Sequence, residues 1–392
     1  MFYQKQICQL PYSKDPPYLL SLFLAATREI ADRSFTIQQI KSTTVFPEIV
    51  TVQGKHILHW DMQYWEFFDR FLLELTYLLM DSAYVKRFSN RVLALFYDYL
   101  SLKLLPFPGL AYCIQVNRER RFSISEKEPM ANLETLHLPG STYESSTYYS
   151  RFLVFYHEFF HFYYKLNPSK KVEDCERLSR LAKFYCEEDW LANAEDGIIA
   201  DLLMEGFQTL LHSGPNKLLE EASCDYRALI ETISMQCLLA NNVDKIFIGE
   251  LQKIHDAFHI NQVFLCYLTN ICACWEALYK SYLRVDSFEE LHKISQPYFD
   301  KAAQMAIIRN SIIPDFLDKL NIKKYGMLSY VSVLDKPYIK AAIRNVTDEM
   351  VDLNFMLYAI EESIRLSQLP HYNPFELKNI VLSNAGYLTE RS

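Results

Sequence analysis

The residues most able to do chemistry lie in one apolar stretch, residues 152–164, which reads FLVFYHEFFHFYY. Every side chain in it is apolar or aromatic except those of His157, Glu158 and His161. A helix that is apolar on all sides is buried, and a buried carboxylate is costly unless it is paired or bound to a cation. The stretch therefore places three polar groups where something must neutralise and hydrogen-bond them.

The spacing of these three residues is that of a metal site. His157 and His161 are four apart, so they project from one helix face and can share one metal ion. Glu158 lies about 100° round the helix and can reach a metal-bound water as a general base. The alternative is a buried aromatic helix with two satisfied histidines, since H-E-x-x-H arises by chance in about one in a hundred chains.

A third ligand is expected on another inward-facing helix, because zinc hydrolases normally supply three protein ligands and leave one position for water. Residues 217–236 read KLLEEASCDYRALIETISMQ, and on a helical wheel Glu221 and Asp225 fall among small and apolar residues. A second stripe, which looks solvated, holds Glu220, Arg227 and Glu231. Glu221 is the expected ligand, and Glu220 is the alternative if the helix register differs.

H-E-x-x-H followed by E-x-x-x-D-x-x-A resembles the gluzincin branch of the zincin metallopeptidases. The matching segment is Glu221-Ala-Ser-Cys-Asp225-Tyr-Arg-Ala228, and the resemblance covers roughly residues 133–235. It implies that Glu221 is the third zinc ligand and that Asp225 orients a ligand histidine. It also implies a short strand before the catalytic helix, at residues 133–138. The chain departs from the usual pattern at Cys224, and at the bulky residues Phe159, Phe160 and Phe162.

The resemblance implies a zinc metallopeptidase whose Zn²⁺ is held by His157, His161 and Glu221 and lowers the pKa of a bound water. Glu158 would take the proton of that water as it attacks a carbonyl carbon, then pass the proton to the leaving amine. The expected substrate is an intracellular protein or peptide. Two alternatives stay open: a catalytically silent zincin-like binding or regulatory module, and a metal-free helical scaffold.

Other histidines and large aromatic residues fit less specific roles. His255 and His259 form a second i,i+4 pair, expected on an exposed helix face; the alternative is that one of them stabilises an oxyanion. His212 precedes a Ser-Gly-Pro break and is a further alternative as metal ligand, although a histidine near a helix C-terminus is the simpler interpretation. His56 and His59 fall on a strand-like segment and are expected to share neither a face nor a helix with the motif. The residues expected in the core are Trp60, Tyr64 and Trp65.

The elements that must position these residues are mainly helical. Only 9 glycines against 27 tyrosines and 26 phenylalanines favour long helices over a many-stranded architecture. Strand-like stretches occupy residues 35–60, and Asp61 caps a helix over 62–80. A helix over 83–104, short strands at 110–116 and 121–125, and a Ser/Thr-rich linker at 141–150 follow. The helices predicted beyond this linker span 148–166, 171–185, 192–212, 217–240, 243–283, 287–310 and 347–367, with a small strand at 326–333.

The expected fold class is α+β and predominantly helical, with a zincin-like catalytic core. Residues 1–145 form a mixed α/β portion with a small sheet, residues 146–285 a helical zinc-binding portion, and residues 286–392 a helical C-terminal portion.

Composition narrows the class of partner. The net charge of −8 disfavours nucleic acid and anionic membranes as main partners. Nine cysteines without a C-x-x-C pair indicate reduced thiols rather than a disulfide framework. The N-terminus shows no secretory signal pattern, and no stretch of eighteen apolar residues occurs. We therefore expect a soluble cytoplasmic protein.

Overall fold

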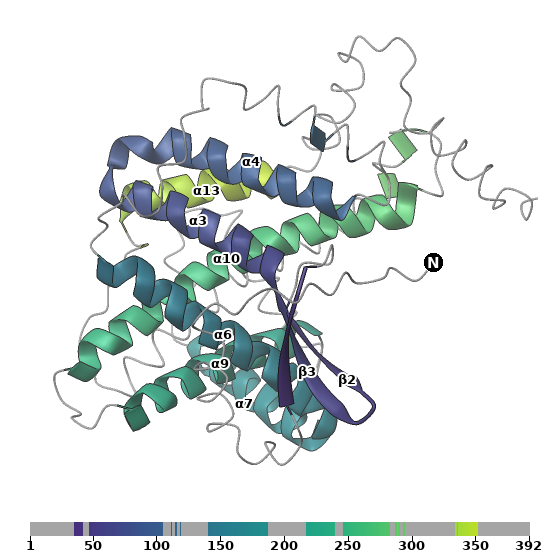
Figure 1. The fold of residues 1–392 in the computed structure, drawn as a ribbon, viewed down its shortest axis with the longest axis vertical. Coiled ribbons are helices and arrows are strands. Elements are labelled where there is room, and N and C mark those ends of the chain that lie inside the picture. Colours follow the sequence, from purple (N-terminus) through teal and green to yellow (C-terminus); the bar gives the residue numbers. More distant parts are fainter. Residues whose placement is uncertain are drawn as a thin grey trace, which may run out of the picture. The chain divides into compact units, whose positions relative to one another are not determined.

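The computed structural model describes residues 35–41, 47–104, 140–186, 217–239, 246–282 and 336–351, together with positions 111, 114, 115, 118, 287, 289, 290, 293, 294 and 334. Within these residues the fold is mostly helical with one three-stranded sheet, as the predicted α+β class requires (Figure 1).

The sheet consists of β1 (Phe35–Ile40), β2 (Glu48–Val52) and β3 (Lys55–Asp61), in the order β1–β3–β2. β1 pairs with β3 in parallel, and β2 pairs with β3 in antiparallel. The β2–β3 hairpin turns at Gln53 and Gly54, whose φ angles of 51° and 75° are both positive, as a type I′ turn requires. The strands predicted within residues 35–60 are confirmed.

Helix α3 (Met62–Met80) follows β3 directly, and its bounds match the prediction. The Asp61 Oδ1 atom accepts a hydrogen bond from the Gln63 backbone N–H at 2.9 Å, which satisfies one of the unpaired amides of the first turn. A 3₁₀ turn, η1 (Ser82–Tyr84), then leads into α4 (Val85–Lys103). Trp60, Tyr64 and Trp65 are buried in the core, as expected.

The remaining described helices are α6 (Gly140–Leu166), α7 (Pro168–Cys186), α9 (Lys217–Leu239), α10 (Ile246–Tyr282) and α13 (Pro337–Val351). The linker predicted at residues 141–150 is wrong, because α6 already begins at Gly140. Ser146 and Ser150 are fully buried there, and the Ser150 carbonyl accepts a hydrogen bond from Asn261 Nδ2 at 3.5 Å. Packing thus outweighs the weak helix propensity of the Ser/Thr run.

The strand predicted at residues 110–116 is also wrong, because the described positions Ala111, Ile114 and Gln115 are helical. Ala111 and Ile114 are buried three residues apart, a spacing that a helix produces as readily as a short apolar strand. Several other predicted elements lie outside the described residues, namely those at 121–125, 133–138, 192–212 and 326–333, most of those at 287–310 and 347–367, and His212.

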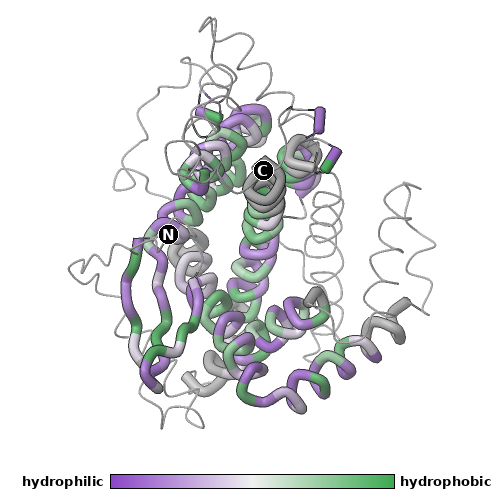
Figure 2. The backbone as a smooth tube through the Cα atoms, turned by 90° about the vertical axis from the view of Figure 1, so that its right-hand side faces the viewer, coloured by the Kyte–Doolittle hydropathy of each residue, from purple (hydrophilic) through white to green (hydrophobic). Residues whose placement is uncertain are grey.

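The chain divides into two compact units. The first comprises Met1–Leu72, Leu138–Phe264 and Ile307–Asp335, and the second comprises Leu73–His137, Leu265–Ala306 and Lys336–Ser392. The three portions predicted from the sequence stay a prediction. Figure 2 shows apolar and polar positions interspersed along the helices. Among the described residues, none of the helices has the length and apolar character that a membrane span requires.

Candidate metal centre

Helix α6 carries the apolar stretch of the motif, and one of its faces packs against β3. The Phe155 and Phe162 rings contact Trp60 and His56, with ring centroids 5.0 Å and 4.5 Å apart. Phe155 and Phe162 are seven residues apart and therefore share one face of α6. The centre of the 157/161 pair lies about 130° round the helix from that face. The sheet therefore covers one side of α6 and leaves the histidine pair on another.

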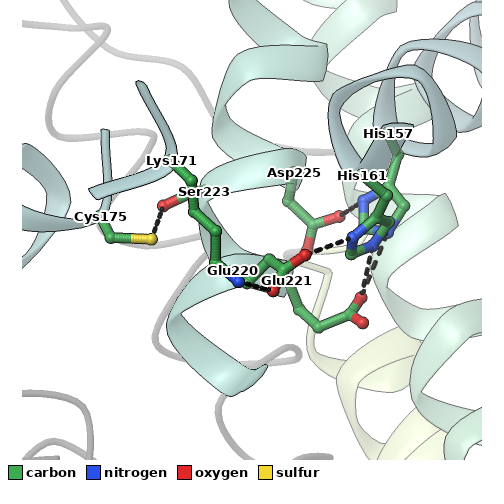
Figure 3. Close-up of polar contacts among 8 residues, drawn as sticks. All are labelled: His157, His161, Lys171, Cys175, Glu220, Glu221, Ser223 and Asp225. Carbon is green, nitrogen blue, oxygen red and sulfur yellow. Dashed lines mark hydrogen bonds and ion pairs between the residues drawn. The ribbon is translucent and has the colours of Figure 1, made fainter. Parts of the chain in front are cut away.

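Helix α9 packs along α6 more extensively than any other described helix, and it supplies the carboxylates that meet the histidines. The Glu221 Oε2 atom lies 3.2 Å from His157 Nε2 and 3.4 Å from His161 Nε2. The two Nε2 atoms are 3.1 Å apart. The three ligand atoms all lie within 4.8 Å of one another, so a single cation could contact all of them. These contacts are drawn in Figure 3.

The second carboxylate of α9, Asp225, lies behind His157. Its Oδ1 atom is 2.7 Å from His157 Nδ1, and Asp225 is only 2 % exposed. A carboxylate at that distance favours a proton on Nδ1, so Nε2, which faces Glu221, is the nitrogen that a metal would take. Asp225 therefore lies where it can orient the His157 ring.

A third carboxylate, Glu220, contacts His161 from its other side. The Glu220 Oε1 atom is 3.2 Å from His161 Nδ1, while Glu220 Oε2 forms an ion pair with Lys171 of α7. The expectation that Glu220 belongs to a solvated stripe is wrong, because it lies between two helices and is only partly exposed. Glu220 and Glu221 contact opposite nitrogens of the same imidazole ring, so only Glu221 joins the cluster of ligand atoms.

Electrostatics at the site favour positive charge on the histidine side. Burial lowers the pKa of His157, but Asp225 and Glu221 together outweigh it and raise the pKa to about 10. The same two carboxylates would stabilise a cation held there. Burial raises the pKa of Glu220, but hydrogen bonds from Lys171 and His161 outweigh it and hold the pKa below its usual value. Glu220 is thus ionised and accepts from both partners.

Further contacts between α6, α7 and α9 do not involve the two histidines. The Tyr164 hydroxyl donates to Asp174 Oδ2 at 3.0 Å, and Arg227 Nε lies 3.7 Å from the same oxygen. Arg227 also stacks over the Phe160 ring, 4.8 Å from its centroid. These contacts join α6, α7 and α9.

No protein-family model matches this chain, and no curated protein or solved structure matches it.

His157, His161, Glu221 and Asp225 converge, and Glu158 lies half-buried on α6, one residue beyond His157. Of the second histidine pair, His255 is 2 % exposed and His259 is half-buried, so the exposed face expected for this pair is wrong.

The contact between Glu220 and Lys171 was not predicted from the sequence. Lys171 lies 49 residues before Glu220 and comes from a different helix, so no spacing rule relates them. The sequence held one indication of a separate contact for Glu220. Adjacent side chains on a helix point about 100° apart, so Glu220 and Glu221 must face different neighbours.

Proposed function

We propose that the chain is a zinc-dependent metallopeptidase of the gluzincin type, acting on a peptide or protein substrate. The observation that carries this proposal is the convergence of His157 Nε2, His161 Nε2 and Glu221 Oε2 within 4.8 Å of one another. Two imidazoles and one carboxylate form a ligand set of catalytic zinc sites, which leave a further position for water. The contact between Asp225 and His157 supports this assignment.

The fold gives further support for a zincin-like core. The helix with the H-E-x-x-H motif packs against a second helix with the E-x-x-x-D motif, and a small sheet covers another face of the first helix. Cys175 and Cys224 are buried, reduced thiols on α7 and α9, which is consistent with the cytoplasmic location predicted from the sequence.

The roles proposed for the side chains follow from their chemistry. Bound zinc would supply the Lewis acidity that lowers the pKa of water and polarises a carbonyl oxygen. His157, His161 and Glu221 would hold the metal, and Asp225 would keep the Nε2 atom of His157 directed toward it. The Glu158 carboxylate would accept a proton from water and donate it to the leaving amine of the cleaved peptide.

The first test is the metal content of the purified full-length chain. We expect about one zinc per chain in the wild type and a clear loss in His157→Ala and Glu221→Ala, measured by elemental analysis. Glu231→Ala, on the same helix but paired with Arg227, is the matched control and should keep the metal. A wild type that binds no zinc after zinc is added back would remove the case for this function.

The second test separates catalysis from metal binding. Glu158→Gln should retain zinc but lose hydrolysis of a peptide library, because the amide cannot accept the proton. If the wild type holds zinc but cleaves nothing in the library, the chain is better described as a metal-binding module without peptidase activity.

A further inference from the structure

Each of the two histidines of the candidate metal centre is backed by its own carboxylate from α9. Asp225 Oδ1 lies 2.7 Å from Nδ1 of His157, and Glu220 Oε1 lies 3.2 Å from Nδ1 of His161. The hydrogen bond made by one imidazole nitrogen decides which nitrogen is left to bind a metal. Each contact therefore favours a proton on Nδ1 of its ring and leaves Nε2 for a metal. Only Asp225 belongs to the E-x-x-x-D motif.

The carboxylate of Glu220 is shared between two helices. Its Oε1 atom contacts His161 of α6, and its Oε2 atom forms an ion pair with the Lys171 ammonium of α7 (Figure 3). A glutamate side chain has three rotatable bonds, so a single contact would leave its carboxylate free to reorient. Contacts at both oxygens restrict this reorientation, because a flip of the carboxylate would break both of them.

We propose that Glu220 is a positioning residue that directs His161 Nε2 toward the metal, and that Lys171 holds Glu220 in the orientation this requires. Helix α7 thereby contributes to the metal centre without supplying a ligand. The inference rests on the proposed zinc function and extends it to two residues outside the H-E-x-x-H and E-x-x-x-D patterns.

The ion pair with Lys171 also distinguishes Glu220 from its neighbour Glu221. Glu220 and Glu221 are adjacent, and both lie within 3.4 Å of a nitrogen of His161. An ammonium ion at Glu220 Oε2 stabilises that carboxylate away from the ligand cluster and leaves Glu221 as the carboxylate beside both Nε2 atoms. A lysine at this position thus favours one of two otherwise similar acids as the ligand.

The test is the zinc affinity of the full chain, measured by competition with a chromophoric chelator. We expect Glu220→Ala to weaken zinc binding by about 10–100-fold, the usual loss for a group that orients a ligand histidine. Lys171→Met should weaken it by a smaller factor. The direction is diagnostic, because a lysine acting only by its charge would repel the cation, and its removal would then strengthen binding. Lys170→Met is the matched control, since Lys170 pairs with Glu173 and Asp174 of its own helix.

A charge exchange distinguishes positioning from a merely structural ion pair. In the double variant Lys171→Glu/Glu220→Lys the ion pair between α7 and α9 is restored, but His161 Nδ1 no longer faces a carboxylate. We expect the metal-free double variant to melt near the wild type while its zinc affinity stays low. The absorption spectrum of bound Co²⁺, which reports ligand geometry, should change in Glu220→Ala and not in Lys170→Met.

The outcomes are separable from those of the proposed function. A wild type that binds no zinc overturns both proposals. A wild type that binds zinc, with unchanged affinity in Glu220→Ala or restored affinity in the exchanged pair, overturns only this one. If Glu220→Ala does not fold, Glu220→Gln replaces it; its amide oxygen can still accept from Nδ1–H but lacks the charge that holds Lys171. Affinity equal to that of the wild type in this variant would again overturn the role of the ion pair.

Discussion

At the scale of single residues, the site depends on which nitrogen of each histidine is occupied. His161 has Glu220 at Nδ1 and Glu221 at Nε2, at 3.2 Å and 3.4 Å respectively. One imidazole is therefore enclosed by two consecutive residues of one helix. This is possible because consecutive side chains diverge by about 100° and α9 runs close beside α6. The same divergence explains why a pair of adjacent acids need not be redundant.

A residue remote from the site gives a prediction about pH. The Asp69 Oδ1 atom is buried in α3, and burial raises the pKa of this carboxyl to about 6, with Arg151 acting in the opposite direction. The folded pKa is above the unfolded one, so the folded state binds the proton more tightly than the unfolded chain. The contribution of Asp69 to stability is therefore greatest below about pH 4 and is lost as the pH rises to about 6.

Asparagine does not ionise, so Asp69→Asn should remove the fall in stability that ionisation of Asp69 causes. We therefore expect this variant to be more stable than the wild type at pH 7. After allowance for solvent screening at this partly exposed side chain, the gain is about 1–2 kcal/mol. The measurement is the free energy of unfolding in urea at pH 4 and pH 7 for both proteins. An equal pH dependence in the two proteins would show that Asp69 is not a titrating group in this range.

At the scale of elements, the approach of α9 to its neighbours depends on small buried residues. Ala222, Cys224 and Ala228 are almost completely buried on α9. Ala228→Leu should destabilise the protein by about 1–3 kcal/mol, because the added carbon atoms have no space in a close-packed interface. Leu229→Met is the matched control, a swap of similar volume at the next buried position, and should cost less. Urea unfolding compares the two, and a smaller loss in Ala228→Leu would contradict close packing at that position.

The elements that the sequence predicted well are those with local signals. Helix α3 was predicted to its bounds because Asp61 caps it, and the predicted ends of α7, α9 and α10 lie within a few residues of those observed. The start of α6 was missed, because burial of Ser146 and Ser150 is a tertiary effect that propensity does not contain.

In the candidate site, too, spacing along the sequence predicts pairs within one helix but not every contact between helices. Pairs on one helix, such as His157 with His161 or Glu221 with Asp225, follow from i,i+4 spacing alone. The contact of Lys171 with Glu220 joins two helices and depends on how α7 packs against α9, so no sequence period predicts it. The burial of His255 was missed for a related reason, because flanking charged residues suggested an exposed face that packing of α10 does not provide.

At the scale of the whole molecule, all the residues proposed for the metal centre belong to one compact unit. The set lies within Leu138–Phe264 and comprises His157, Glu158, His161, Lys171, Glu220, Glu221 and Asp225. They come from three separate helices, which the unfolded chain does not hold together. A metal that binds this arrangement therefore binds the folded state far better than the unfolded state, and its binding free energy adds to stability.

We accordingly expect zinc to raise the melting temperature of the full chain. Free zinc at about 100 times its dissociation constant adds about 2.7 kcal/mol to the free energy of unfolding. Scanning calorimetry with excess zinc and with a chelator measures the difference, and His157→Ala should show almost none. If His157→Ala responds as strongly as the wild type, zinc acts elsewhere on this acidic chain, whose net charge is −8. Stabilisation of the wild type alone would indicate that zinc binds at the two histidines and Glu221. Only the folded chain brings α6 and α9 together, so zinc bound there stabilises the folded state.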